Sequence, residues 1–229
     1  MAKEYFLNLL KVRKEKKNWV YAPGQALLRL TEFPRIEWFD KIFGSYEKLC
    51  KSIGLKIKYT NIKIDVDLAS NIDIQIDTRE QKELVFPKHI TTVSKKLEYG
   101  DIALANDCKI AIERKSLNDL CGTIGINGYE RFKRELIRAK EDGGYLVILC
   151  ENSLNDFKSI EFLPQTKRVK ASYSWLAKRI RDLYLEFDNI QFVFCSGRKH
   201  AVKVAEVILK LSNKVKKTDI QLAIDKKIL

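Results

Sequence analysis

The chain has 229 residues, with 43 Lys and Arg against 30 Asp and Glu, and so a formal net charge of +13. This length predicts one or two domains. The excess of positive charge favours a polyanionic partner, and DNA or RNA is the first candidate. The sequence has no apolar run long enough to span a membrane and no secretory signal, so we expect no membrane association. Five scattered cysteines indicate reduced thiols in the cytoplasm, and two distant histidines argue against a histidine metal site or a Ser-His-Asp triad.

Residues 1–70 predict a small helical module. Within Ile36–Leu55, apolar residues recur at i, i+3 and i+4, and Gly44 ends one helix where Ser45 can cap the next. This arrangement is typical of a helix-turn-helix-like DNA-binding element, and its second half resembles short DNA-binding repeats of phage and homing endonucleases. A helical hairpin that serves only packing is an equal alternative. Residues 56–70 favour a linker or an edge strand.

From residue 71 onward, strand-like segments alternate with helical segments, which predicts an α/β domain over residues 71–212. Several segments have the apolar content or period-two alternation of β-strands: 71–77, 102–105, 109–113, 145–151 and 189–195. Between them lie segments with helical periodicity: 129–142, 173–187 and 199–211. This alternation predicts a mixed sheet flanked by helices. Residues 213–229 form a basic C-terminal tail, which frays or packs as a final helix.

Two of the predicted strands flank a polar turn at Asn106-Asp107 and so predict a short hairpin. With the turn centred there, Asp101 lies opposite Glu113, and directly opposed Cβ atoms are about 5 Å apart. Lys115 falls on the same face, together with small alanines that leave room beside the acids. Two carboxylates at this distance repel each other unless a cation lies between them, and oxygen ligands suit Mg²⁺ or Mn²⁺.

A divalent cation at this position predicts a hydrolytic function. The cation polarises a phosphate and generates hydroxide from water near neutral pH. Lys115 can orient that water or stabilise the transition state. Two acids with a lysine in E-x-K spacing are therefore the parts of a metal-dependent phosphodiester hydrolase. The alternative is a surface ion cluster across the hairpin, with no catalytic role.

The segment Asp77-Thr78-Arg79-Glu80 ends the first predicted strand and carries further candidates. Asp77 joins the acid pair if that strand neighbours the hairpin, and Glu80 is a further ligand, direct or through water. Arg79 is a candidate to hold the scissile phosphate or to pin the carboxylates.

These segments together resemble the signature of the XPF-type nuclease domain, which is D-x-R-E, then GD, then ERK-x3-D. The matching residues are Asp77-Thr78-Arg79-Glu80, Gly100-Asp101, and Glu113-Arg114-Lys115 with Asp119. Arg131, after the turn Asn127-Gly128, extends the likeness, which covers roughly residues 72–212. The resemblance implies a restriction-endonuclease-like fold, magnesium at the edge of the sheet, and cleavage of DNA near branches, flaps or junctions.

Carried over by position, the resemblance implies these catalytic residues: Asp77, Arg79, Glu80, Asp101, Glu113, Arg114 and Lys115. The carboxylates among them would hold or support the metal: Asp101, Glu113, Asp77 and Glu80. Lys115 would be the catalytic lysine, and the two arginines would contact phosphate or organise the acids. Asp119 completes the motif, but Ser116-x-x-Asp119 is also a capping box, so we favour a structural supporting role for Asp119.

DNA contacts are predicted in Pro164–Arg181, a stretch that contains no acid. The candidates are five of its basic residues together with Arg131, which the resemblance adds: Lys167, Arg168, Lys170, Lys178, Arg179 and Arg131. Tyr173 and Trp175 either stack on unpaired bases or belong to the core of the next helix. On the helix 129–142, the spacing of Arg131 and Glu135 favours ordinary i,i+4 ion pairing.

The sequence therefore predicts a magnesium-dependent DNA endonuclease, with manganese able to substitute, that acts on branched, flap or junction DNA in repair, recombination or replication. One alternative is a catalytically silent DNA-binding subunit, and another is a sequence-specific restriction-type enzyme. One arrangement compatible with the sequence is a homodimer that associates through the nuclease domain, and the sequence identifies no other protein partner. We expect the protein in the cytoplasm, where it is associated with the nucleoid, or in the cytoplasm of the host if the protein is viral.

Overall fold

A six-stranded mixed sheet forms the centre of the computed structural model, which describes residues 2–31, 33–60, 63–107, 109–162 and 171–229. The strand order is β2-β1-β3-β4-β5-β6. The strands are β1 Ile72–Ile76, β2 Ile90–Ser94, β3 Ile102–Leu104, β4 Ile110–Lys115, β5 Tyr145–Cys150 and β6 Ile190–Phe194. The pairs β1-β3 and β3-β4 are antiparallel, and the other neighbouring pairs are parallel. The predicted mixed sheet is confirmed.

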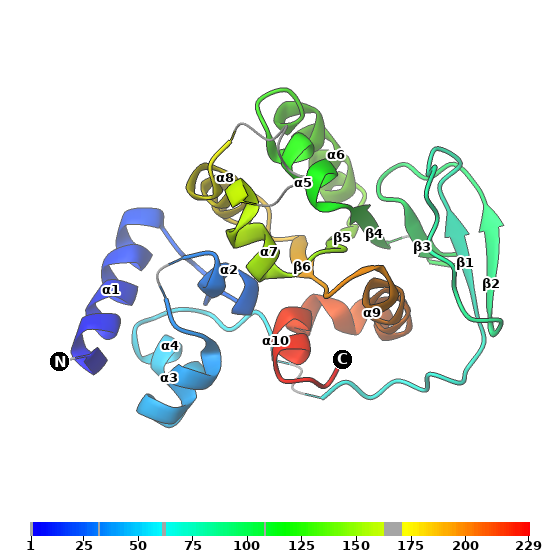
Figure 1. Ribbon diagram of the computed structural model, residues 1–229. Helices are drawn as coiled ribbons and strands as arrows, with labels where there is room; N and C mark the ends of the chain where they lie inside the picture. Colours follow the sequence, from blue (N-terminus) through cyan, green and yellow to red (C-terminus); the bar gives the residue numbers. More distant parts are fainter. Residues whose placement is uncertain (1, 32, 61–62, 108, 163–170) are drawn as a thin grey trace.

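Helices cover both faces of this sheet (Figure 1). One layer contains α5 Leu117–Ile124, α6 Tyr129–Glu141, α7 Leu154–Lys158, the 3-10 helix Ile160–Phe162 and α8 Tyr173–Glu186. The other contains α9 Arg198–Leu211, the 3-10 helix Ser212–Lys217 and α10 Ile220–Asp225. Because both faces are covered, β5 is buried along its whole length, as its continuous apolar sequence YLVILC requires.

The two faces of the central hairpin divide as the alternation predicts. Ile102 and Ile112 lie in the core beneath α9, whereas Ala103 and Ala111 lie in the core beneath α5 and α6. One expectation about this face is wrong. The alanines are fully buried and leave no open space beside the acids, because the helical layer packs directly on them. Because alanine side chains are small, the helices of that layer pack close to the sheet.

The N-terminal module consists of α1 Ala2–Lys17, α2 Gln25–Arg29, α3 Ile36–Phe43 and α4 Tyr46–Ser52. The predicted break between the last two helices is confirmed. Gly44 adopts the left-handed φ of 78° that ends α3, and the Ser45 hydroxyl caps α4 by accepting from the Lys48 amide. Phe39 lies at the centre of an aromatic cluster of this module, in contact with the rings of Phe6 and Tyr46.

The module is docked on the rest of the molecule through α2. The Arg29 guanidinium pairs with the Asp225 carboxylate of α10 at 2.6 Å, and the backbone amide of Gln25 donates to the Asp219 carboxylate at 2.7 Å. Arg181 of α8 donates to the Leu30 carbonyl at 3.1 Å. These contacts join the two parts of the chain, whereas residues 56–60 and 63–70 between them in the sequence belong to no named helix or strand. Residues 63–70 run along the bottom of Figure 1 to β1.

The C-terminal residues pack against the sheet rather than fray. Val215 and Ile220 are fully buried, and α10 is capped by the Asp219 side chain, which accepts from the Leu222 amide. Of the two outcomes left open for residues 213–229, the final helix is therefore the one observed.

The strand β2 has no counterpart among the predicted elements. It pairs in parallel with β1 at the edge of the sheet, and residues 91–94 on it are exposed. An exposed edge needs no apolar alternation, so the sequence ITTVS gives little sign of a strand. In the part of the chain that the structure describes, no helix is long and apolar enough to cross a membrane.

Candidate active site

The central hairpin brings Asp101 and Glu113 together. Ile102 pairs with Ile112 and Ala103 with Ala111, which is the predicted register. One step beyond these pairs, the Asp101 amide donates to the Ile112 carbonyl at 2.7 Å, and the Arg114 amide donates to the Asp101 carboxylate at 2.8 Å. The acids therefore meet at the end of the hairpin remote from its turn.

Burial dominates the electrostatics of this pair. Glu113 is 6% exposed, and burial together with the charge of Asp101 raises the pKa of its carboxyl. Burial also raises the pKa of Asp101, against the opposing effect of Lys115. The ammonium of Lys115 contacts the Glu113 carboxylate directly. Burial disfavours the ammonium, but the neighbouring carboxylates outweigh it and raise the pKa of Lys115. Two acids and a lysine thus share one partly closed site.

Asp77 lies beside this pair but its carboxylate is fully engaged. It follows the last residue of β1 and is 2% exposed. One oxygen accepts from the amide and the Nε of Arg79, and the other accepts from Arg79 Nη2 and from the Leu97 amide, at 2.7–2.8 Å. These bonds with Arg79, against burial, lower the pKa of Asp77 to about 2. The Asp77 amide also donates to the Asp101 carbonyl at 2.8 Å, which joins β1 to the hairpin at the site.

Glu80 is likewise paired, in its case with Arg114. The two guanidinium nitrogens Nε and Nη2 of Arg114 donate to the two oxygens of Glu80 at 3.1 and 3.0 Å, and both side chains are 7% exposed. Burial raises the pKa of Glu80, but the bonds from Arg114 outweigh it and leave the pKa lowered. In this structure Arg114 therefore organises an acid, one of the two roles the resemblance implies for it.

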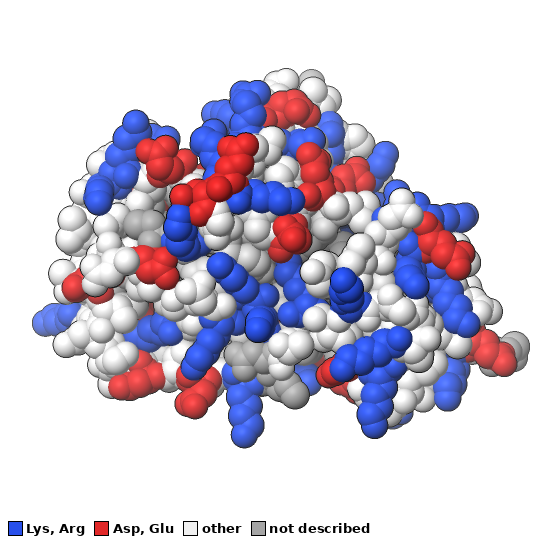
Figure 2. Space-filling view, turned by 180° about the vertical axis from the view of Figure 1, so that it is seen from behind, with Lys and Arg blue, Asp and Glu red and all other residues white. Residues whose placement is uncertain are grey.

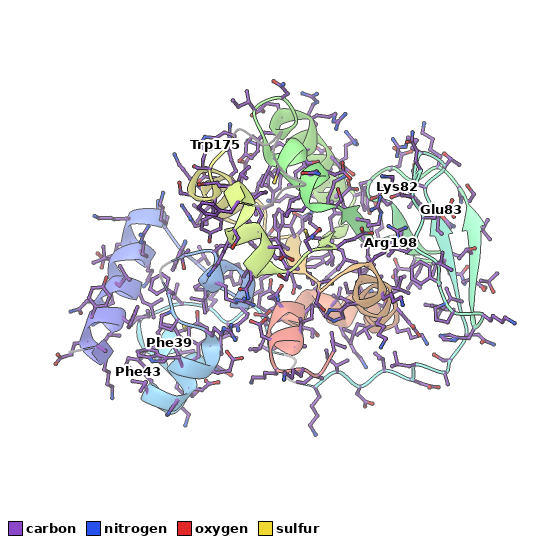
Figure 3. The ribbon with its side chains drawn as sticks, in the orientation of Figure 1. Phe39, Phe43, Lys82, Glu83, Trp175 and Arg198 are labelled. Atoms are coloured by element: carbon purple, nitrogen blue, oxygen red, sulfur yellow. The ribbon has the colours of Figure 1, made fainter. Side chains whose placement is uncertain are left out.

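The Arg114 pair continues into a chain of charges that sequence reasoning missed. Arg114 Nη1 donates to Glu151 at 3.1 Å, and Arg198 Nη1 donates to the same oxygen at 2.6 Å. Arg198 Nη2 then reaches the carbonyls of Lys82 and Glu83, at 2.7 and 2.5 Å, from the start of α9 (Figure 3). Lys82 and Glu83 follow Glu80 in the sequence, so this series of contacts ends in the same loop where it begins. It therefore holds the loop 80–83 against the sheet.

A sequence signal for Glu151 exists in the topology. β4 and β5 are parallel, and the Glu151 amide donates to the Lys115 carbonyl at 2.9 Å. The residues after neighbouring parallel strands meet at one edge of a sheet, so a polar residue after β5 was a candidate on that ground. The same argument applies to Arg198, because β6 is parallel to β5 and Arg198 begins α9 shortly after β6 ends.

A further carboxylate reaches the site from α6. Glu135 is half-buried, and its Oε1 accepts from the Gly100 amide at 2.9 Å. Its charge contributes to the raised pKa of Asp101 and of Glu113. The interpretation of Glu135 as one of a set of ordinary i,i+4 ion pairs is wrong, because its carboxylate is turned toward the sheet rather than along the helix.

The donors suit a hard divalent cation, although among the described residues no three His, Cys, Asp or Glu side chains form a ready-made metal cluster. Asp101 and Glu113 fit best. Each has one oxygen held by the protein, by the Arg114 amide and by Lys115, and their mutual repulsion is what a cation would relieve. Asp77 and Glu80 already have arginine partners, so their part in holding a metal would be indirect.

Comparison with known proteins identifies the family. The model of the ERCC4 domain matches residues 76–208, which run from the end of β1 into α9 and include the site residues described above. The chain belongs to the ERCC4 domain family. The predicted resemblance to XPF-type nuclease domains is thereby confirmed, and the chain is a nuclease by family. No curated protein sequence matches this chain.

Two solved structures are similar to parts of this ERCC4-domain protein. XPF from Aeropyrum pernix is 19% identical, with a TM-score of 0.47 over 68% of this chain and 69% of that chain. XPF from Aeropyrum pernix in complex with DNA is 21% identical, with a TM-score of 0.48 over 63% of this chain and 66% of that chain.

The predicted DNA contacts of the ERCC4 domain are only partly described. Lys167, Arg168 and Lys170 lie outside the described residues. Lys178 and Arg131 are exposed, on α8 and on the first turn of α6. Basic side chains are spread over the face seen in Figure 2, with acidic ones among them.

Arg179 is held in a stack of aromatic rings. Its guanidinium carbon lies 4.1 Å from the ring centre of Tyr129 and 4.7 Å from that of Trp175. Trp175 and Tyr173 are partly buried and pack on the core, as the structural alternative predicts. Asp119 is exposed in the cap of α5, where its amide donates to the Ser116 hydroxyl at 3.2 Å and its carboxylate accepts from it at 2.7 Å. The supporting role favoured for Asp119 agrees with this position.

Proposed function

We propose that this protein is a magnesium-dependent DNA endonuclease that hydrolyses phosphodiester bonds, with a preference for branched, flap or junction DNA. The observation that carries the proposal is the buried pair Asp101 and Glu113 beside Lys115, in a chain of the ERCC4 domain family. The net charge of +13 supports a polyanionic substrate, and one of the similar structures is a complex with DNA.

The proposed roles follow from the contacts of each side chain. Asp101 and Glu113 would hold the metal, and Mn²⁺ would replace Mg²⁺ because both prefer oxygen ligands. When bound, such an ion polarises the scissile phosphate and lowers the pKa of a water molecule. Lys115, whose pKa is raised by the acids around it, would stabilise the negative charge that develops on the phosphate. Arg79 has a side chain 63% exposed beyond its bonds to Asp77, so it is available to a DNA phosphate.

The test is cleavage of labelled duplex, flap, fork, gapped and single-stranded DNA with Mg²⁺, with Mn²⁺ and with EDTA. Asp101→Asn and Glu113→Gln keep the shape of each side chain and remove its charge, so we expect each to lower the cleavage rate at least 100-fold. Glu141→Gln, an exposed carboxylate at the end of α6, is the matched control and should cleave like the unaltered protein.

The same experiment separates the alternatives. DNA binding without cleavage, unchanged in Asp101→Asn, would reject the catalytic proposal and favour a silent DNA-binding subunit. Cleavage of unbranched duplex at one fixed sequence would favour a restriction-type enzyme instead. Faster cleavage of the branched substrates, lost in both variants and in EDTA, would support the proposal.

A further inference from the structure

We propose that Glu135 is a positioning residue of this site, whose carboxylate holds the Gly100 amide and thereby places Asp101 opposite Glu113. This inference rests on the proposed function, because it assigns Glu135 a part in preparing the same acid pair. It concerns a residue of α6, outside the D-x-R-E, GD and ERK-x3-D segments.

The first step of the argument is the hydrogen bond itself. Glu135 Oε1 accepts from the Gly100 amide at 2.9 Å across a separation of 35 residues. The next residue, Asp101, is tied on its other side to β4, since its amide donates to the Ile112 carbonyl and its carboxylate accepts from the Arg114 amide. Asp101 is thus positioned between one anchor on α6 and another on β4.

The second step is the conformation of Gly100, which leaves little freedom for another arrangement. Its φ of 72° is in the left-handed region, and a Cβ on it would lie 2.9 Å from the Ala111 Cβ and 3.1 Å from the Ile112 carbonyl oxygen. The chain therefore turns sharply just before Asp101, and the amide at the turn faces α6 instead of a strand. A partly buried amide of this kind requires an acceptor, which Glu135 supplies.

The third step is that Glu135 has no competing partner on its own helix. Among the ion pairs of the described residues, none joins Glu135 to Arg131 or Arg138, the arginines that share its face. Its carboxylate is instead bonded to the amide of Gly100, the residue next to Asp101, and its negative charge contributes to the raised pKa of Asp101 and of Glu113. A carboxylate that only formed ion pairs along the helix surface would point along the helix and not toward Gly100.

The test compares variants that separate the acceptor from the charge. Glu135→Gln keeps an oxygen that can accept from the Gly100 amide, whereas Glu135→Ala and Glu135→Met lose it, and Met preserves the length of the side chain. We expect the two variants without an acceptor to cleave flap DNA 10- to 100-fold more slowly and to bind Mn²⁺ correspondingly more weakly by calorimetry. Glu135→Gln should stay within threefold of the unaltered protein in both measurements. Glu141→Ala on the same helix is the control.

A readout independent of cleavage keeps this inference separate from the proposed function. Amide hydrogen exchange, followed by mass spectrometry on peptides that contain Gly100, should be at least tenfold faster in Glu135→Ala and Glu135→Met and unchanged in Glu135→Gln. If the unaltered protein cleaves no DNA, the exchange result still decides the role of Glu135. Equal exchange in all variants would overturn the proposal, and so would loss of Mn²⁺ binding in Glu135→Gln to the extent seen in Glu135→Ala. Melting curves identify any variant that is unfolded, and the remaining acceptor-free variant then decides.

Discussion

Asp77 is the residue whose chemistry differs most from what its motif suggests. Its carboxylate accepts bonds from Arg79 and from the Leu97 amide on both oxygens, so it acts first as an anchor between β1 and the loop before the hairpin. A carboxylate with its acceptor positions filled has little capacity for a metal ion. Asp101 and Glu113 differ because each keeps an oxygen available beside the other acid.

Replacement of Asp77 by Asn should reduce stability in a pH-dependent way. Because the folded pKa is about 2, below the unfolded value of about 3.9, the ionised carboxylate stabilises the fold at neutral pH. The stabilisation is present above about pH 4 and is lost as the pH falls toward 2, since both states then bind the proton. We expect Asp77→Asn to lower the free energy of unfolding by about 2 kcal/mol at pH 7, measured by urea denaturation.

The control for this prediction is Asp73→Asn, an exposed aspartate on the same strand, which should change stability little. A deficit in Asp77→Asn that keeps its full size down to pH 2 would show that the charge of Asp77 is not what stabilises the loop.

At the scale of single elements, two glycines with nearly equal backbone angles have different surroundings. Gly44 after α3 has a φ of 78°, and a Cβ added to it would meet no atom within 4 Å, whereas Gly100 before β3 has a φ of 72° and close neighbours. The first glycine serves only to end a helix. The second also lets the turn before β3 lie directly on β4 and β5, because Ala111 and Leu146 occupy the space a side chain would need.

The two glycines therefore predict different effects of alanine. Gly44→Ala should lower the free energy of unfolding by about 1 kcal/mol, the effect of the backbone angle alone. Gly100→Ala should lower it by about 3 kcal/mol, because steric overlap adds to the same angle, and should also slow DNA cleavage by displacing Asp101. Chemical denaturation of both variants measures the difference. Equal losses would mean that the turn at Gly100 relaxes without strain.

At the scale of the whole molecule, the N-terminal module and the ERCC4 domain behave as joined parts. The contact between α2 and α10 contains a nearly buried ion pair, with Arg29 and Asp225 side chains 10% and 5% exposed. Arg29 also donates to Asn155 at the start of α7 at 3.1 Å, so one residue links the module to both helical layers. Removal of one partner from a buried pair leaves an uncompensated charge.

Arg29→Ala should therefore lower the free energy of unfolding by about 3 kcal/mol. Lys51→Ala is the matched control, because it breaks a solvent-exposed pair with Glu47 inside the module and should change stability by less than about 0.5 kcal/mol. In urea we expect the unaltered chain to unfold in one transition, followed by both circular dichroism and tryptophan fluorescence. Two separate transitions, with Arg29→Ala affecting neither, would show that the module folds independently.

The sequence by itself determined the features that depend on near neighbours along the chain. Period-two alternation located β1, β3 and β4, helical periodicity located α6 and α9, and the polar turn set the hairpin register that faces Asp101 with Glu113. The helix caps at Ser45 and Ser116 followed from the same local chemistry.

Only the tertiary structure decided which acids have partners. Asp77 is bonded by Arg79 and Leu97, Glu80 is paired with Arg114, and Glu135 is turned to Gly100. The edge strand β2 and the docking of α2 on α10 were decided in the same way. The physical reason is that a hydrogen bond or ion pair between distant residues is selected by distance and burial in the folded chain, and neither is encoded in the local period of the sequence.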